Sequence, residues 1–144
     1  MSNDSDGDPG KLGTKDFLSI SNLDHRVLER LLELAAQMKK DRRLGAKAPT
    51  ASALSGHHVA LLFEKPSLRT RHSSEMAVVQ LGGHPLVFRA DEVGPRSREP
   101  LADIAQVLSG YHAAFGARVF AHADLEVLAA CLTKSAATLH ERCA

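Results

Sequence analysis

Short apolar runs that alternate with helix-patterned segments constrain the fold of this chain more than any other feature. The apolar runs are too short for helices and are typical of buried strands. The predicted strands lie at about residues 58–63, 84–88 and 116–121. The predicted helices lie at about residues 24–40, 70–81, 100–111 and 124–132. The Gly82-Gly83 pair is expected to end the second of these, and loops are expected at 44–56 and 91–99. Strands that alternate with helices predict an α/β domain, in which a parallel sheet carries helices on both faces.

The first predicted helix, residues 24–40, carries a continuous apolar stripe. Ser21 or Asp24 is placed to cap its first turn. Its apolar residues recur at helical spacing: Val27, Leu28, Leu31, Leu32, Leu34, Ala35 and Met38. The basic cluster at residues 39–43 suits the negative end of the helix dipole. A cluster this short indicates a solvated helix end more than a nucleic-acid patch.

Composition narrows the classes of protein and partner. The 144 residues are enough for one domain with a core. A net charge of +1 and an aromatic content of 4% argue against nucleic-acid and membrane partners. No apolar run could span a bilayer, and the acidic N-terminus lacks the apolar core of a signal peptide. Because two cysteines are too few for a disulfide framework, reduced thiols and a cytoplasmic location are expected.

The segment Phe63–Arg71, which reads Phe-Glu-Lys-Pro-Ser-Leu-Arg-Thr-Arg, joins a predicted strand to a predicted helix. It places hydroxyl and guanidinium groups where the helix begins. A helix N-terminus offers unpaired N–H groups and a partial positive charge, and arginine grips phosphate through two hydrogen bonds. The segment therefore predicts a phosphate site. The simpler interpretation is an N-cap serine with surface arginines; neither the P-loop nor the Gly-x-Gly-x-x-Gly pattern occurs there.

With its later segments, the sequence resembles the N-terminal, carbamoyl-phosphate-binding domain of the aspartate/ornithine carbamoyltransferase family. The resemblance covers about residues 15–130 in the family's order and spacing. It is carried by Phe63–Arg71, by Gln80–His84 (Gln-Leu-Gly-Gly-His), by Arg98–Asp103 (Arg-Glu-Pro-Leu-Ala-Asp), by Val107–Ser109 and by Arg118–His122 (Arg-Val-Phe-Ala-His). The Phe-Glu-Lys form of the first motif resembles the ornithine branch.

The resemblance implies a role for each matching residue. The expected ligands of carbamoyl phosphate are Ser67, the backbone of Leu68, Arg69, Thr70 and Arg118. Arg69 and Arg118 are the expected catalytic residues, because an amine would attack the carbamoyl carbon and phosphate would leave. The family's ornithine branch makes citrulline in arginine biosynthesis by this reaction. The resemblance implies no covalent intermediate, no metal and no cofactor. Arg71 would make structural ion pairs.

Other residues are weaker candidates. Glu92 lies in a loop that in relatives reaches a neighbouring subunit's site, and a binding role for it is doubtful. His57 and His58 would point to opposite faces of a strand and would not converge on a metal. A structural role for His122 is as plausible as a catalytic one. The resemblance implies a homotrimer, or association with a full-length transcarbamylase.

The chain departs from the family pattern at two positions and at its end. His72 stands where an apolar residue is usual, and Ser74 stands where an aromatic residue is usual. We expect a disordered tail at residues 1–13, a carbamoyl-phosphate-binding domain at 14–130 and a divergent tail at 131–144. The family's fourth strand, its His-Pro-x-Gln motif and its amino-acid-binding domain are not recognised after about residue 130.

The sequence leaves the function open between three alternatives. The first is an ornithine-carbamoyltransferase-like chain that holds the carbamoyl-phosphate half of a site, is apparently truncated and has no turnover alone. The second is a non-catalytic interaction or regulatory fragment of a transcarbamylase. The third is an aspartate-type or other carbamoyltransferase, because the residues that choose the acceptor amine belong to the second domain.

Overall fold

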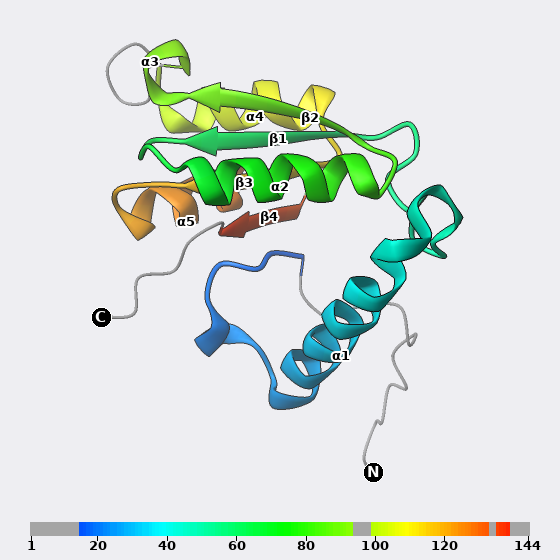
Figure 1. Cartoon of the computed structure of the whole chain (residues 1–144). Helices are drawn as coiled ribbons and strands as arrows, with labels where there is room; N and C mark the ends of the chain where they lie inside the picture. The colour runs from blue at the N-terminus through cyan, green and yellow to red at the C-terminus, as the bar shows by residue number, and fades with distance from the viewer. Residues whose placement is uncertain (1–14, 94–98, 133–134, 139–144) are drawn as a thin grey trace.

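The computed structural model describes residues 15–93, 99–132 and 135–138. Helices and strands alternate along the chain, as predicted (Figure 1). The helices are α1 (His25–Asp41), α2 (Leu68–Gln80), α3 (Ala90–Val93), α4 (Leu101–Tyr111) and α5 (His122–Cys131), with 3-10 helices η1 (Ile20–Asn22) and η2 (Arg42–Lys47). The strands are β1 (His58–Phe63), β2 (His84–Arg89), β3 (Ala114–Arg118) and β4 (Ser135–Thr138). The expected tail at residues 1–13 lies outside the described residues.

The four strands form one parallel sheet in the order β2-β1-β3-β4. Because β1 lies between β2 and β3, segments that follow different strands meet at one edge. The register sets Phe63 opposite Arg89 on one side and opposite Arg118 on the other. The carboxyl ends of these strands are therefore level, and the turns that follow them share one edge of the sheet.

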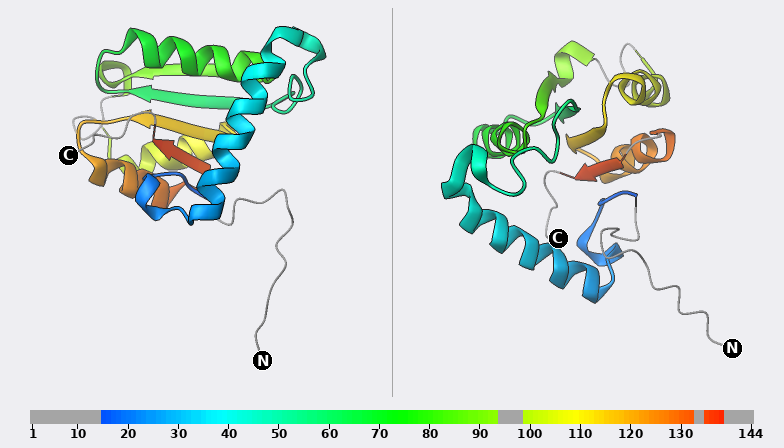
Figure 2. Two further views of the ribbon diagram at one scale, coloured as in Figure 1. Left: turned by 60° about the horizontal axis from the view of Figure 1, so that its bottom comes forward. Right: turned by 90° about the vertical axis from the view of Figure 1, so that its right-hand side faces the viewer.

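Helices cover both faces of the sheet, which confirms the predicted α/β class. On one face α2 packs through Val78 against Val59, Leu61 and Phe63. On the other face α4 and α5 pack over a larger cluster whose fully buried side chains include Leu62, Phe115, Leu125 and Leu128. Figure 2 shows α2 on one side of the strands and α4 and α5 on the other. The period-two alternation of β1 explains both clusters, since its successive side chains enter opposite layers.

The expectation that no fourth strand follows residue 130 is wrong. Residues 135–138 form β4, which pairs in parallel with β3 from Ala114 to Ala117. The strand reads Ser-Ala-Ala-Thr, so it lacks the apolar run from which the other strands were predicted. Its pairing comes from the backbone groups that β3 would otherwise leave open at the sheet edge.

Three other segments differ from the sequence-based expectation. β3 was expected at 116–121 but ends at Arg118, because β1 ends opposite it at Phe63. The loop expected at 91–99 begins with α3, and its residues 94–98 lie outside the described part. The loop expected at 44–56 begins within the 3-10 helix η2.

Helix α1 forms where predicted but buries none of its residues. Asp24 caps it, since its carboxylate accepts a hydrogen bond of 2.8 Å from the Arg26 N–H. Leu32 and Leu34 remain 62% and 49% exposed. The apolar stripe therefore predicts the helix correctly, but the other described residues do not bury that stripe.

Gly82 ends α2 in a backbone conformation that favours glycine. Its φ is 82°, and the N–H of Gly83 donates to the Val78 carbonyl over 3.0 Å. A Cβ at Gly82 would lie 2.6 Å from the backbone oxygen of Ala51. The predicted role of the Gly82-Gly83 pair as the end of the helix is confirmed.

We expect Gly82→Ala to destabilise the protein more than the matched change Gly56→Ala. Gly56 also has a positive φ, of 74°, but a Cβ there would meet nothing within 4 Å. Both changes carry the left-handed cost of about 1–2 kcal/mol. Only Gly82→Ala adds a clash with backbone, which raises its loss by about 1 kcal/mol or more. Urea denaturation measures both free energies of unfolding, and equal losses would contradict the packing seen at Gly82.

Candidate anion-binding site

The predicted phosphate segment lies at the carboxyl edge of the sheet, immediately after β1. Phe63 is the last residue of β1 and is flanked in register by Arg89 of β2 and Arg118 of β3. Residues 64–67 form the motif turn, and α2 begins at Leu68. The sheet register and the motif turn together bring the start of α2 and the end of β3 to the same edge.

The start of α2 presents its first turn to solvent. Ser67 is the N-cap residue in an extended conformation, with φ −158° and ψ 93°, but its side chain makes no capping hydrogen bond. Leu68 is 85% exposed. The hydroxyl of Ser67 is therefore available beside the N-terminus of a 13-residue helix. That combination favours an anion, because the helix dipole and the first N–H groups point outward there.

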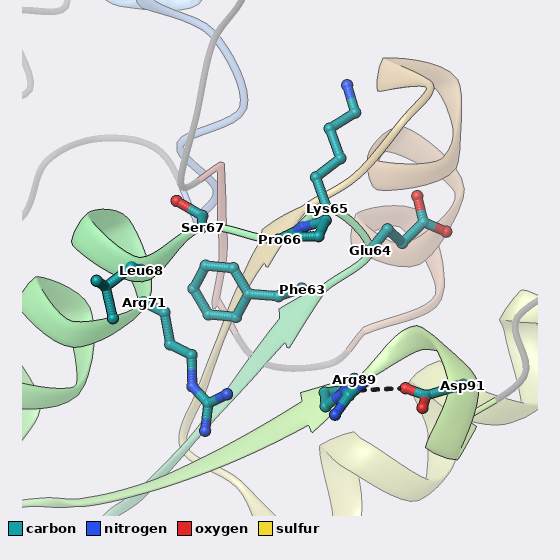
Figure 3. A pocket seen from close by; sticks show the side chains of 9 residues that line it. All are labelled: Phe63, Glu64, Lys65, Pro66, Ser67, Leu68, Arg71, Arg89 and Asp91. Carbon is teal, nitrogen blue, oxygen red and sulfur yellow. Dashed lines mark ion pairs between the residues drawn. The ribbon is translucent and has the colours of Figure 1, made fainter.

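A cavity of about 420 Å³ adjoins this turn (Figure 3). Its lining residues come from the end of β1, the motif turn, the first turn of α2 and the end of β2: Phe63, Glu64, Lys65, Pro66, Ser67, Leu68, Arg71, Arg89 and Asp91. Of the residues expected to bind carbamoyl phosphate, Ser67 and Leu68 line it. Arg69, Thr70 and Arg118 do not.

Arg118 is the predicted site residue whose surroundings are most informative. Its side chain is half-buried, and its Nε is buried with no hydrogen-bond partner in the described part of the chain. A buried guanidinium N–H without an acceptor is costly, so such groups usually have a partner. Arg69, by contrast, is exposed in the first turn of α2. Within the described ranges its side chain has no ion pair.

The sequence reasoning missed two basic residues of this cavity, Lys65 and Arg89. Arg89 ends β2 and pairs through Nε with the Asp91 carboxylate at 3.1 Å (Figure 3). Its position directly after a predicted strand was the available signal. The expectation that Arg71 makes a structural ion pair is confirmed, since its Nε lies 3.0 Å from Glu75 Oε1. Two of the cavity's arginines thus already have carboxylate partners.

The weaker candidates have local contacts. Glu92 accepts a hydrogen bond of 2.8 Å from the backbone N–H of Arg89, which ties α3 to the end of β2. His122 lies 3.8 Å from Glu126 on the same helix. His57 and His58 are both exposed. Among the described residues, no group of three or more His, Cys, Asp or Glu side chains is placed to hold a metal ion.

The two positions that depart from the family pattern are not in the core. His72 is exposed, and Ser74 is half-buried on α2. The face of α2 that reaches the core does so through Val78. A polar residue at position 74 therefore removes apolar contact at the margin of the domain and leaves no buried unsatisfied hydroxyl in the described part.

A second, larger cavity of about 730 Å³ lies between the end of α1, η2 and the end of α2. Lys39 and Arg42 are its basic lining residues. It is lined by the C-terminal residues Gln80 and Leu81 of α2, whereas the motif turn lies at that helix's N-terminus. Size alone does not make it the site, because its lining includes neither the motif residues nor the N-terminus of an α-helix.

The fold and the edge site define an α/β domain with a candidate anion site beyond the ends of its strands. Comparison with known proteins gives that class a family. Residues 15–138 match the family described as "Aspartate/ornithine carbamoyltransferase, carbamoyl-P binding domain". The chain belongs to the aspartate/ornithine carbamoyltransferase family.

Individual relatives agree with this assignment. An ornithine carbamoyltransferase from Hyperthermus butylicus is 46% identical over 122 residues, which are 85% of this chain and 38% of that protein. One from Thermus thermophilus is 43% identical over 115 residues, 80% of this chain and 36% of that protein. The chain thus spans little more than a third of the length of the curated relatives it matches.

Solved structures show the same fold. The ornithine carbamoyltransferase from Pyrococcus furiosus superposes with a TM-score of 0.80 at 36% identity, over 86% of this chain and 39% of that one. The crystal structure of the enzyme from Thermus thermophilus gives a TM-score of 0.76 at 40% identity, over 86% and 41%. Another similar structure is an N-acetyl-L-ornithine transcarbamylase, at 27% identity and a TM-score of 0.76.

The described helices include none that is long and apolar enough to cross a membrane. One similar solved structure is a mitochondrial ornithine carbamoyltransferase from Coccidioides immitis. The cytoplasmic location expected from the sequence stays a prediction.

We expect Glu92 to order the end of β2. Glu92→Ala removes the acceptor of the Arg89 N–H, and a hydrogen bond to a charged group contributes about 1.5 kcal/mol. Hydrogen exchange at the Arg89 amide should then accelerate about tenfold. Glu92→Gln keeps a side-chain acceptor and serves as the matched control. Unchanged exchange in Glu92→Ala would show that the contact does not order this segment.

Proposed function

We propose that this chain binds carbamoyl phosphate at the carboxyl edge of β1 and β3, as the carbamoyl-phosphate-binding part of an ornithine-carbamoyltransferase-like protein. The observation that carries the proposal is the buried Nε of Arg118, which has no acceptor among the described residues. Arg118 ends β3, which pairs with β1. The motif turn that follows β1 places Ser67 at the start of α2. An anion at this edge would supply the missing acceptor. The family match supports carbamoyl phosphate as that anion.

Each predicted residue has a distinct part in this proposal. The phosphate group accepts hydrogen bonds from the first N–H groups of α2, including that of Leu68, and from the hydroxyls of Ser67 and Thr70. Arg69 and Arg118 supply positive charge, and a guanidinium fork can bind two oxygens at once. Arg118 is the last residue of β3, so its backbone is held by the sheet.

The reaction supported by these groups is carbamoyl transfer. An amine nitrogen attacks the carbamoyl carbon, the carbon–oxygen bond to phosphate breaks, and the phosphate leaves with the bonding electron pair while the amine loses a proton. Negative charge develops on the carbonyl oxygen and on the departing phosphate. Fixed donors aimed at such charge typically contribute about 2.7–4 kcal/mol each to transition-state stabilisation. We assign that role to Arg69 and Arg118.

We propose ornithine as the acceptor amine, giving citrulline. The support is the set of relatives named ornithine carbamoyltransferase and the Phe-Glu-Lys form of the motif. The similar N-acetyl-L-ornithine transcarbamylase shows that a relative of this fold takes a modified ornithine. Because the matched region is the carbamoyl-phosphate domain, we propose that the 144-residue chain alone has no turnover.

The second candidate function is that of an interaction module within a transcarbamylase assembly. The observation that favours it is the apolar stripe of α1, none of whose residues is buried. A homotrimer or a complex with a full-length transcarbamylase would cover such a surface. Co-purification with a complete transcarbamylase supports this function, and a monomer that ignores such a partner counts against it.

We expect the chain to bind inorganic phosphate and carbamoyl phosphate, and the binding to depend on Arg118. Arg118→Ala removes a charged donor, so the affinity should fall about tenfold or more. Arg118→Lys keeps the charge but loses the guanidinium fork, so its affinity should lie between those of the original chain and Arg118→Ala. Arg30→Ala, on exposed α1, is the control and should leave the affinity unchanged. Isothermal titration calorimetry measures all four affinities.

Two outcomes would contradict the proposal. Phosphate affinity that is the same in Arg118→Ala and in the original chain would place the anion elsewhere. Citrulline formation by the purified chain with ornithine and carbamoyl phosphate would overturn the inference that it has no turnover alone.

A further inference from the structure

Contacts between the motif turn and the segment after β3 link parts of the chain that are far apart in sequence. The backbone N–H of Glu64 donates to the carbonyl of Arg118 over 2.9 Å. The backbone N–H of Phe120 donates to Glu64 Oε2 over 2.6 Å. The ammonium group of Lys65 lies 4.9 Å from the centroid of the Phe120 ring. Glu64 therefore holds both the last residue of β3 and the residue two positions beyond it.

The sheet itself provides no partner for this segment. β1 ends at Phe63, opposite Arg118, so the N–H of Phe120 has no strand beside it on that side. The Glu64 carboxylate takes the place of a strand carbonyl. A hydrogen bond to an ionised acceptor is shorter and stronger than a neutral one, which agrees with the 2.6 Å distance.

Core packing does not hold Phe120 in place. Its side chain is 65% exposed, and the ring contact with Lys65 is the aromatic interaction found for it in the described part of the chain. A cation over an exposed ring contributes modestly. Val119 packs against the larger core cluster, and beyond it the Glu64 carboxylate holds the backbone at Phe120.

We propose that Glu64 is a positioning residue for the anion site, acting through Arg118. By fixing the backbone on both sides of Val119, Glu64 sets the direction in which the Arg118 side chain leaves β3. In this proposal it aims the guanidinium toward the start of α2, where Ser67 is the N-cap residue and its hydroxyl makes no capping hydrogen bond. This inference rests on the proposed phosphate site, since Glu64 itself touches no substrate.

A carboxylate beside an anion site needs explanation, because its charge repels phosphate. Glu64 lines the same cavity as Ser67, so its negative charge would lie close to the proposed anion. The N–H of Phe120 and the neighbouring ammonium of Lys65 offset part of that charge. Either role lets the neutral isostere Glu64→Gln bind phosphate equally well or more tightly, so Glu64→Ala, which also loses the hydrogen bond, distinguishes the two roles.

The test compares Glu64→Ala with Glu64→Gln. The amide of Glu64→Gln keeps an acceptor for the Phe120 N–H and removes the negative charge. We expect its phosphate affinity, measured by titration calorimetry with inorganic phosphate, to be equal to or above that of the original chain. Glu64→Ala loses the acceptor, and its affinity should fall about tenfold. Glu29→Ala, an exposed α1 glutamate that pairs with His25, is the control and should change nothing.

NMR signals of Phe120 and Arg118 distinguish a positioning role of Glu64 from a general effect on stability. In two-dimensional NMR spectra of the free chain, we expect Glu64→Ala to speed exchange of the Phe120 amide proton and to shift the Arg118 Nε–H resonance. Glu64→Gln should preserve both. Urea denaturation of each variant shows whether the affinity change merely follows a change in the folded fraction.

Three results would overturn the proposal that Glu64 positions Arg118. Tighter phosphate binding by both variants would show that Glu64 acts only through its charge, and equal binding by both would show that it positions nothing. Unchanged Phe120 and Arg118 signals in Glu64→Ala would also overturn it. If the original chain binds no phosphate, the proposed function fails, while the NMR signals still decide whether Glu64 orients Arg118.

Discussion

The pairing of β1 with β3 is the interaction on which the rest of this structure depends. It sets Phe63 opposite Arg118 and so brings the ends of two strands, distant in sequence, to the same level. The motif turn follows the end of β1, and Arg118 is the last residue of β3. Without this register the start of α2 and the end of β3 would not lie at the same edge of the sheet. The hydrogen bond from Glu64 to the Arg118 carbonyl extends the same pairing by one step beyond β1.

The core explains why this register is held. Successive residues of β1 enter different layers, so Leu62 packs beneath α4 and α5 while Phe63 packs beneath α2. A slip of one residue would exchange those layers and move each apolar side chain to the wrong face. The position of the site is therefore fixed by apolar packing, whereas its own groups stay exposed or unpaired. In the proposed function, stability and anion binding are supplied by different residues of the same strand end.

Much of the fold followed from sequence because its signals are local. The apolar run at His58–Phe63 and the helical stripes are readable from neighbouring residues, and the glycine pair after α2 marks its end. β4 could not be predicted in this way, since Ser-Ala-Ala-Thr becomes a strand only by pairing with β3. The hydrogen bond between Glu64 and Phe120 likewise depends on a contact across the sheet edge. Side-chain contacts between distant segments, such as those that line the cavity beside Ser67, need the register to be known first.

The most direct test of this account is a two-dimensional NMR titration of the chain with inorganic phosphate. We predict that the largest shifts fall on the amides of Leu68, Arg69 and Thr70 and on the Nε–H of Arg118, with little change at His58 and His84 at the opposite edge. Shifts centred on Lys39 and Arg42, which line the larger cavity beside α1, would contradict the account. So would the absence of any shift at millimolar phosphate.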